Sequence, residues 1–206
     1  MSTDAPAITG AIQGGRPLRR YRRLITLVSL LFLGPGNLNG QDDAKAEAWE
    51  ALRYFLGTWE GKESGVAGLG EGERPYVFIM DGTYLVAANT STFEPQEANP
   101  EGEVHEDWAF FRYDKLRMAV VLREFHGEGF VNQYVLEEAG LPGVLVFVSE
   151  AIEKLPAGWR ARVTLTIQDD DHFEETFELA APAEDFELLL NNQWTRRVAD
   201  EQAGEI

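Results

Sequence analysis

Cysteine is absent from the 206 residues of the chain, and its absence excludes several kinds of site. The protein can form no disulfide framework and no thiolate metal site, and it has no cysteine nucleophile. It also lacks the cysteine that a lipoprotein anchor requires after an export signal. Histidine is scarce too, with only His105, His126 and His172 present. A metal site would have to consist mostly of carboxylates, and none is predicted.

Basic residues are also scarce in this chain. The chain has 18 Lys+Arg against 35 Asp+Glu, for a net charge of −17. Residues 1–40 hold five of the arginines and one aspartate, which leaves 13 basic and 34 acidic residues in the remainder. A body this acidic repels nucleic-acid phosphates and anionic lipid headgroups, and it is typical of a soluble surface. We therefore expect no nucleic-acid partner.

Motifs of nucleophilic catalysis are missing as well. The chain contains no Gly-x-Ser-x-Gly sequence. His105 and Glu106 precede Asp107 at the start of a predicted strand, and no serine is adjacent. Pairs of acidic residues are frequent, but a chain this rich in acids places them together by chance. These absences favour a protein that is not an enzyme.

The one long apolar run lies near the N-terminus. Residues 24–34 are apolar or small and follow five arginines between residues 16 and 23, and Pro35 and Gly36 come next. This order is typical of an export signal, whereas a membrane-spanning helix needs about twenty residues. We predict that residues 1–40 form an export signal or an N-terminal tether, with cleavage after Gly40. An uncleaved tether and a start codon assigned too early remain alternatives. The mature protein is expected outside the cytoplasm, in the periplasm or the extracellular space, without a stable membrane span.

Residues 41–54 are predicted to form a short helix. Two aspartates at its start suit the N-terminal helix dipole, and apolar residues recur at helical spacing before Gly57 ends it. After Tyr54 the period changes to two, as in Trp159, Ala161 and Val163 against Arg160 and Arg162. We expect ten strands, near residues 56–63, 73–80, 83–92, 105–113, 116–125, 130–138, 143–150, 159–168, 172–180 and 186–196. Residues 199–206 are expected to be a disordered tail.

Ten alternating strands with no long helix after them constrain the architecture. Each strand has one face to bury, and no helices remain to cover a sheet, so the sheet must pack on itself as a sandwich or close as a barrel. Short connections such as Asp81-Gly82, Asp114-Lys115 and Gly127-Glu128-Gly129 favour an up-and-down order. The sequence therefore predicts an all-β fold.

Residues 55–61, Phe-Leu-Gly-Thr-Trp-Glu-Gly, favour the barrel. They resemble the Gly-x-Trp that opens the first strand of lipocalins, and more closely the start of fatty-acid-binding-like barrels of the nitrobindin kind, within the calycin group. The resemblance implies that Gly57 and Trp59 close one end of a lipocalin-like barrel over residues 55–198. It also implies that Arg196, or Arg197, of the last strand covers Trp59, a contact of about 0.5–2 kcal/mol. Residues 123–134 are similar to uncharacterised bacterial barrels of this group.

Nitrobindins bind haem through a histidine on a late strand, which this chain does not match. No histidine follows His172, and His172 itself comes after Asp169, Asp170 and Asp171 at a turn. The three aspartates lack the glycine and distal glutamate of a calcium loop. No cofactor is predicted.

A small-ligand site is predicted at the hairpin around residues 123–134. Arg123, His126, Asn132 and Tyr134 are the candidate ligand-binding residues. Arg123, Asn132 and Tyr134 are expected to face the lumen, where a cation and two donors could hold a carboxylate. We expect a non-catalytic barrel that binds a small apolar or amphipathic ligand, which includes hydrophobic and carboxylate molecules. The alternatives are an enzyme acting in the same pocket, with His126 as acid or base, and a filled barrel that serves as a structural or interaction module.

Expression of the whole chain in a bacterium with an outer membrane tests the export signal. We expect the protein in the periplasm without residues 1–40, and the mass of the intact protein locates the cleavage. Leu30→Arg places a charge in the apolar run and is expected to retain the full-length chain in the cytoplasm. A full-length wild-type chain in the cytoplasm would contradict export.

Overall fold

The computed structural model describes Glu47, residues 51–137 and residues 143–198. The predicted export segment and the predicted tail therefore lie outside the described residues. Glu47 and residues 51–53 are helical, in agreement with a short helix before the barrel. In these described ranges no helix combines the length and the hydropathy that a membrane crossing requires.

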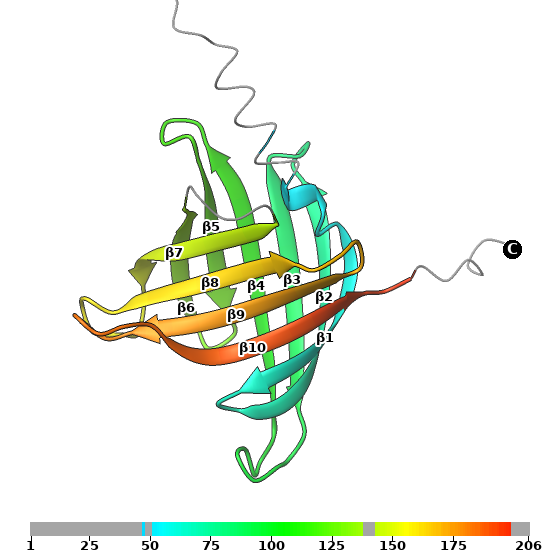
Figure 1. The fold of residues 1–206 in the computed structure, drawn as a ribbon, viewed down its shortest axis with the longest axis vertical. Coiled ribbons are helices and arrows are strands. Elements are labelled where there is room, and N and C mark those ends of the chain that lie inside the picture. The colour runs from blue at the N-terminus through cyan, green and yellow to red at the C-terminus, as the bar shows by residue number, and fades with distance from the viewer. Residues whose placement is uncertain (1–46, 48–50, 138–142, 199–206) are drawn as a thin grey trace, which may run out of the picture. The chain divides into compact units, whose positions relative to one another are not determined.

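Ten antiparallel strands form a closed barrel (Figure 1), which confirms the predicted fold class. Each strand pairs with its neighbours in the sequence, and the last strand pairs with the first. In Figure 1 the strands β8–β10 cross in front of β2–β4. The strands are β1 (Gly57–Gly65), β2 (Gly68–Ile79), β3 (Tyr84–Phe93), β4 (Glu103–Asp114), β5 (Ala119–His126), β6 (Phe130–Leu136), β7 (Val144–Ile152), β8 (Arg160–Ile167), β9 (His172–Ala180) and β10 (Glu187–Arg196).

Strand β2 begins five residues before its predicted start. Residues 68–72 contain three glycines and look like a loop in the sequence, yet they pair with β1. A Cβ atom at Gly72 would lie 2.1 Å from Oε1 of Glu63 and 2.8 Å from the ring of Trp194. A Cβ atom at Gly61, the register partner of Gly72, would lie 2.7 Å from the same ring. The glycines leave room for a large buried indole, so they belong to the wall of the barrel.

Aromatic side chains close one end of the barrel. Trp59 is fully buried, and its Nε1 donates to the backbone oxygen of Phe55 at 2.7 Å. Its ring meets Phe173 edge to face at 4.7 Å between centroids and lies 5.4 Å from Tyr54. Because Tyr54 and Phe55 come from the segment before β1, that segment folds across the end and caps it.

Arg196, rather than Arg197, covers Trp59. Arg196 and Trp59 are register partners in the β1–β10 pair, and the guanidinium carbon of Arg196 lies 4.2 Å from the indole centroid. Its nitrogens donate to the backbone oxygens of Leu56 at 2.6 Å and Tyr54 at 2.8 Å. Arg197 points to the outside and bonds to Glu60 and Glu73 on the surface. One side chain thus ties the last strand to the cap.

The up-and-down order places the turns alternately at the two ends. The capped end carries the β2–β3, β4–β5 and β8–β9 turns, including Asp169, Asp170 and Asp171, as well as His172 at the start of β9. The opposite end carries the β1–β2, β5–β6 and β7–β8 turns and the longer β3–β4 loop. Nothing comparable to the Trp59 cap covers this second end in the described residues, and the cavity described below opens there.

Removal of the Arg196 side chain is expected to loosen the cap. Arg196→Ala deletes the contact with Trp59 and two part-buried hydrogen bonds to backbone oxygens, so the free energy of unfolding should fall by about 2–3 kcal/mol. Denaturation in urea measures the loss. Arg197→Ala is the matched control, because its ion pairs are exposed and contribute little. An equal loss of unfolding free energy in the two variants would show that the contacts of Arg196 with the cap contribute no more than exposed ion pairs do.

Candidate ligand-binding site in the barrel lumen

A cavity of about 440 Å³ occupies the lumen toward the uncapped end. This volume is within the range of small-molecule sites, so the barrel is not filled by its own side chains. Its rim includes Val66, Ala67, Lys154 and Leu155 from the turns at that end. The cavity is hydrophobic on one side and polar on the other.

The apolar side comes mainly from strands β7–β9. Every second residue of a strand points inward, and in these strands most of the inward residues are aliphatic or aromatic. Those that line the cavity are Ile152, Ala161, Val163, Leu165, Phe177 and Leu179. Phe111 and Leu122 from the facing strands complete this surface, which suits the body of an apolar molecule.

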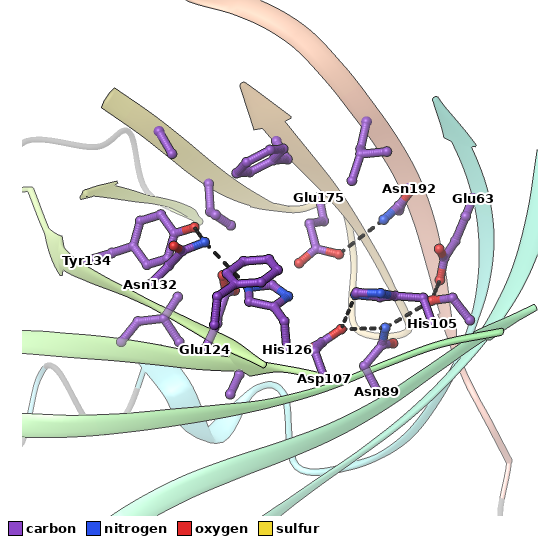
Figure 2. Close-up of a pocket in the computed structure, with 18 of the residues that line it drawn as sticks. Glu63, Asn89, His105, Asp107, Glu124, His126, Asn132, Tyr134, Glu175 and Asn192 are labelled. Atoms are coloured by element: carbon purple, nitrogen blue, oxygen red, sulfur yellow. Dashed lines mark hydrogen bonds and ion pairs between the residues drawn. The ribbon is translucent and has the colours of Figure 1, made fainter. Parts of the chain in front are cut away.

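The polar side comes from strands β1–β6 and from Glu175 and Asn192 (Figure 2). Arg74 is central to it. Its guanidinium pairs with Glu175 at 2.8 Å, donates to Oδ1 of Asn89 at 3.1 Å and lies 4.1 Å from the ring of Trp194. The indole Nε1 of Trp194 donates to the same carboxylate at 3.0 Å. Arg74 is therefore already paired with a carboxylate and hydrogen-bonded through its Nε and Nη1 atoms.

A second group of hydrogen bonds continues from Asn89. Its Nδ2 donates to Asp107 at 2.9 Å and to Ser91 at 2.9 Å, and the hydroxyl of Ser91 donates to Glu63 at 2.8 Å. Burial raises the pKa of Glu63, although Ser91 and Arg74 oppose the effect. Burial also acts to raise the pKa of Asp107, but the bond from His105 and the charge of Arg74 outweigh it and hold that pKa below its usual value.

Glu124 has no arginine or lysine partner among the described side chains of the lumen. Burial, together with the charges of Asp107 and Glu175, raises its pKa to about 8. The nearest base is His126, whose Nε2 lies 3.9 Å from Oε2 of Glu124. Burial lowers the pKa of His126. Near neutral pH the lumen thus holds a protonated carboxyl group beside a neutral imidazole.

Three of the four predicted ligand-binding residues line the cavity. His126, Asn132 and Tyr134 face inward, and Nδ2 of Asn132 lies 3.3 Å from the hydroxyl of Tyr134 and 3.4 Å from Nε2 of His126. The structure thus brings these three side chains together, as Figure 2 shows. Whether they bind a ligand stays a prediction.

The expectation that Arg123 faces the lumen is wrong. Arg123 pairs in register with Gln133, and Glu124 pairs with Asn132. Residues directly opposite in an antiparallel pair point to the same face, so the inward Asn132 puts Glu124 inside and Arg123 outside. There Nε of Arg123 donates to the side chain of Gln133 at 2.8 Å. The predicted carboxylate-binding cation is therefore absent from the hairpin's inner face.

Most of the polar wall was not predicted. Arg74, Asn89, Asp107 and Glu175 come from strands far apart in the sequence and meet only when the barrel closes. A local signal exists in β4, where the inward positions are polar near the open end (His105, Asp107) and apolar farther in. Polar residues that alternate with outward ones in several strands could have indicated this wall.

Comparisons with known proteins support the fold. No protein-family model and no curated protein matches the chain. Among solved structures, the chain is similar to that of Rv2717c from M. tuberculosis, with a TM-score of 0.54 and 16% identity over 73% of this chain and 98% of that one. At this identity the similarity shows the fold alone, a closed ten-stranded antiparallel barrel.

Two designed barrels are weaker matches. A de novo designed fluorescence-activating β-barrel has a TM-score of 0.38 and 14% identity, over 71% of this chain and 97% of the design. EF1p2_mFAP2b, solved bound to DFHBI, has a TM-score of 0.37 and 9% identity over the same shares. These two similarities are too weak to support an inference about this chain.

The raised pKa of Glu124 predicts a pH dependence of stability. The folded-state pKa of about 8 lies above the ordinary 4.5, so the folded protein keeps a proton that the unfolded chain releases between these values. Stability from this proton is complete at low pH and is lost as pH rises toward 8. Glutamine at position 124 cannot titrate, so the variant Glu124→Gln does not share this loss. Its free energy of unfolding relative to wild type should therefore rise by about 2–4 kcal/mol from pH 5 to pH 8.

Urea denaturation at several pH values measures this difference. Glu106→Gln is the matched control, because Glu106 lies on the exposed outer face of β4 near the same end of the barrel. The control should keep a constant difference from wild type. A constant difference for Glu124→Gln as well would show that the carboxyl group is ionised in the folded protein at neutral pH.

Proposed function

We propose that the barrel binds a small amphipathic molecule in its lumen, with an apolar body and a polar head that donates hydrogen bonds. The observation that carries the proposal is the division of the 440 Å³ cavity into an apolar wall and a wall rich in acceptors. The resemblance of residues 55–61 to fatty-acid-binding-like barrels supports a ligand in the lumen. The head group and its chemistry are inferred from the lining.

The polar wall offers acceptors in excess of donors. Several carboxyl groups line it, among them those of Glu63, Asp107, Glu124 and Glu175. Oδ1 of Asn132 and Oδ1 of Asn192 are buried and accept no hydrogen bond from any described residue. Buried polar atoms in native proteins are nearly always paired, so these two unpaired oxygens are candidate acceptors for a donor group of the ligand.

The charges in the lumen favour a cationic head over a carboxylate. Arg74 is paired with Glu175, and Arg123 lies on the outer face. An anionic head would enter a wall of carboxyl groups where the guanidinium of Arg74 is already paired with Glu175, and burying a charge without a partner is costly. An amine presents both the positive charge and the N–H donors that this wall accepts.

The proposed location of the protein is outside the cytoplasm. The arginines and the apolar run of residues 16–34 support this location. A binding protein of this size, with an acidic surface, is suited to the periplasm or the extracellular space, where it would hold a poorly soluble molecule. The fractionation of the whole chain described above tests this part of the proposal.

A second candidate function is acid–base chemistry on the bound molecule. The observation that favours it is the pairing of Glu124, with its pKa of about 8, and His126 3.9 Å away in the same cavity. Neighbouring groups whose pKa values are shifted in opposite directions are typical of acid–base sites. A bound ligand that leaves the protein with a changed mass would favour this candidate over simple binding.

Titration with three ligands of equal chain length tests the proposed head group. We expect decylamine to bind at least about tenfold more tightly than decanoate, with decanol between them, because only the amine supplies charge and donors together. Calorimetry measures the affinities on protein treated with EDTA, and mass spectrometry of the recovered ligand shows whether it has changed.

Two variants locate the binding. Leu179→Trp adds bulk to the cavity wall and is expected to weaken the binding of decylamine at least tenfold. Leu188→Trp places the same side chain at an exposed position of β10 and should leave the affinity unchanged. Tighter binding of decanoate than decylamine would contradict the head group, and equal affinities in the two variants would contradict the lumen as the site.

A further inference from the structure

Two histidines and a glutamate meet at the open end of the barrel. His105 is near the start of β4, His126 is the last residue of β5, and Glu128 follows in the β5–β6 turn. His126 is the register partner of Asp107, so the inward positions bring the two imidazoles together, with ring centroids 5.7 Å apart. Figure 2 shows His105 and His126 on either side of Asp107.

We propose that His105, His126 and Glu128 bind a divalent first-row transition-metal ion at the mouth of the cavity. One donor atom of each residue lies within 4.8 Å of the donor atoms of the other two. A zinc-like ion sits about 2.0–2.2 Å from nitrogen and oxygen ligands, so the three side chains must adjust their positions around it. Glu128 can contribute to this adjustment, because its side chain is 52% exposed and comes from a turn.

His105 is already oriented as a ligand. Its Nε2 lies 3.5 Å from Oδ2 of Asp107, and Asp107 is held in turn by Nδ2 of Asn89 at 2.9 Å. A carboxylate on one ring nitrogen is the usual partner of a metal-binding histidine, because it fixes the ring and directs the other nitrogen to the metal. That other nitrogen, Nδ1, lies 2.7 Å from Oε1 of Glu128.

An ion pair explains the contacts of His105 but leaves one ring nitrogen of His126 without a partner among the described residues. Protonated His105 between Asp107 and Glu128 is a satisfied arrangement, and these contacts raise the pKa of His105 to about 9. Nδ1 of His126, however, is buried and finds no hydrogen-bond partner in the described part of the chain. His126 thus has an unpaired ring nitrogen in a cluster whose donor atoms lie within 4.8 Å of one another.

The donor set indicates the class of metal. Two imidazoles and one carboxylate suit zinc, iron(II), cobalt and nickel rather than calcium or magnesium, which prefer oxygen ligands only. Three protein ligands leave further positions on the ion open. Since His105 and His126 both line the cavity, an open position would face the lumen. The site thus goes beyond the proposed binding of an amine, and it neither requires nor excludes it.

Cobalt(II) titration of EDTA-treated protein without added histidines tests the metal site. We expect one ion per chain, a visible absorption band of a nitrogen-ligated cobalt ion, and displacement of cobalt by zinc. His105→Ala and His126→Ala should each weaken cobalt binding at least about tenfold. Glu128→Gln, in an exposed turn where it does not endanger folding, should weaken binding by a similar or smaller factor.

His172→Ala is the matched control. His172 is the third histidine of the chain, lies at the capped end and contacts only Asp169 through its ring. This variant should bind cobalt as wild type does. Absence of binding by wild type, or binding that survives both His105→Ala and Glu128→Gln, would overturn the proposal. Because the decylamine titrations use metal-free protein, failure of the metal site leaves the proposed ligand binding standing, and the reverse also holds.

Discussion

The pairing of the first strand with the last is the constraint on which the rest of the structure depends. Trp59 and Arg196 face each other in this pair, and Arg196 also bonds to the segment that caps the barrel. The β1–β10 pair therefore closes the ring, and Arg196 at its end ties the ring to the cap. Once that end is shut by aromatic side chains, the lumen can open only at the other, where the turns carry polar and charged residues.

Closure also explains why the interior has two unlike walls. In an up-and-down barrel, strands that are distant in the sequence face each other across the lumen. The inward residues of β7–β9 are mostly apolar, and those of the facing strands are mostly polar. Charges in such a space are costly unless they are paired. Arg74 and Glu175 satisfy each other, while Glu124 lacks a partner of this kind, so its raised pKa is the electrostatic consequence of the closed ring.

Much of the fold could be predicted from the sequence, but less of the site. The alternation in residues 172–180 predicted that strand to the residue, because period two reports which face is buried. Residues 68–72 were missed, because glycines that make room for Trp194 look like a loop. Within the site, the alternation of inward and outward residues puts Arg123 on the opposite face from Asn132, but this follows only once the register of the hairpin is known. Arg74 and Glu175 could not be predicted locally, since they acquire their roles from neighbours across the barrel, whereas the polar inward positions His105 and Asp107 of β4 were a local signal that was not used. The scarcity of histidine suggested that no histidine-rich site could form, yet the barrel brings two of the three together at one rim.

The central claim is that the lumen is a cavity with one apolar wall and one wall that accepts hydrogen bonds. A crystal structure of the protein grown with decylamine tests it most directly. The account predicts the alkyl chain along β7–β9 and the nitrogen within hydrogen-bond distance of Asn132, Asn192 or a lumen carboxyl group. A lumen filled by side chains, or an alkyl chain bound on the outer surface, would contradict it.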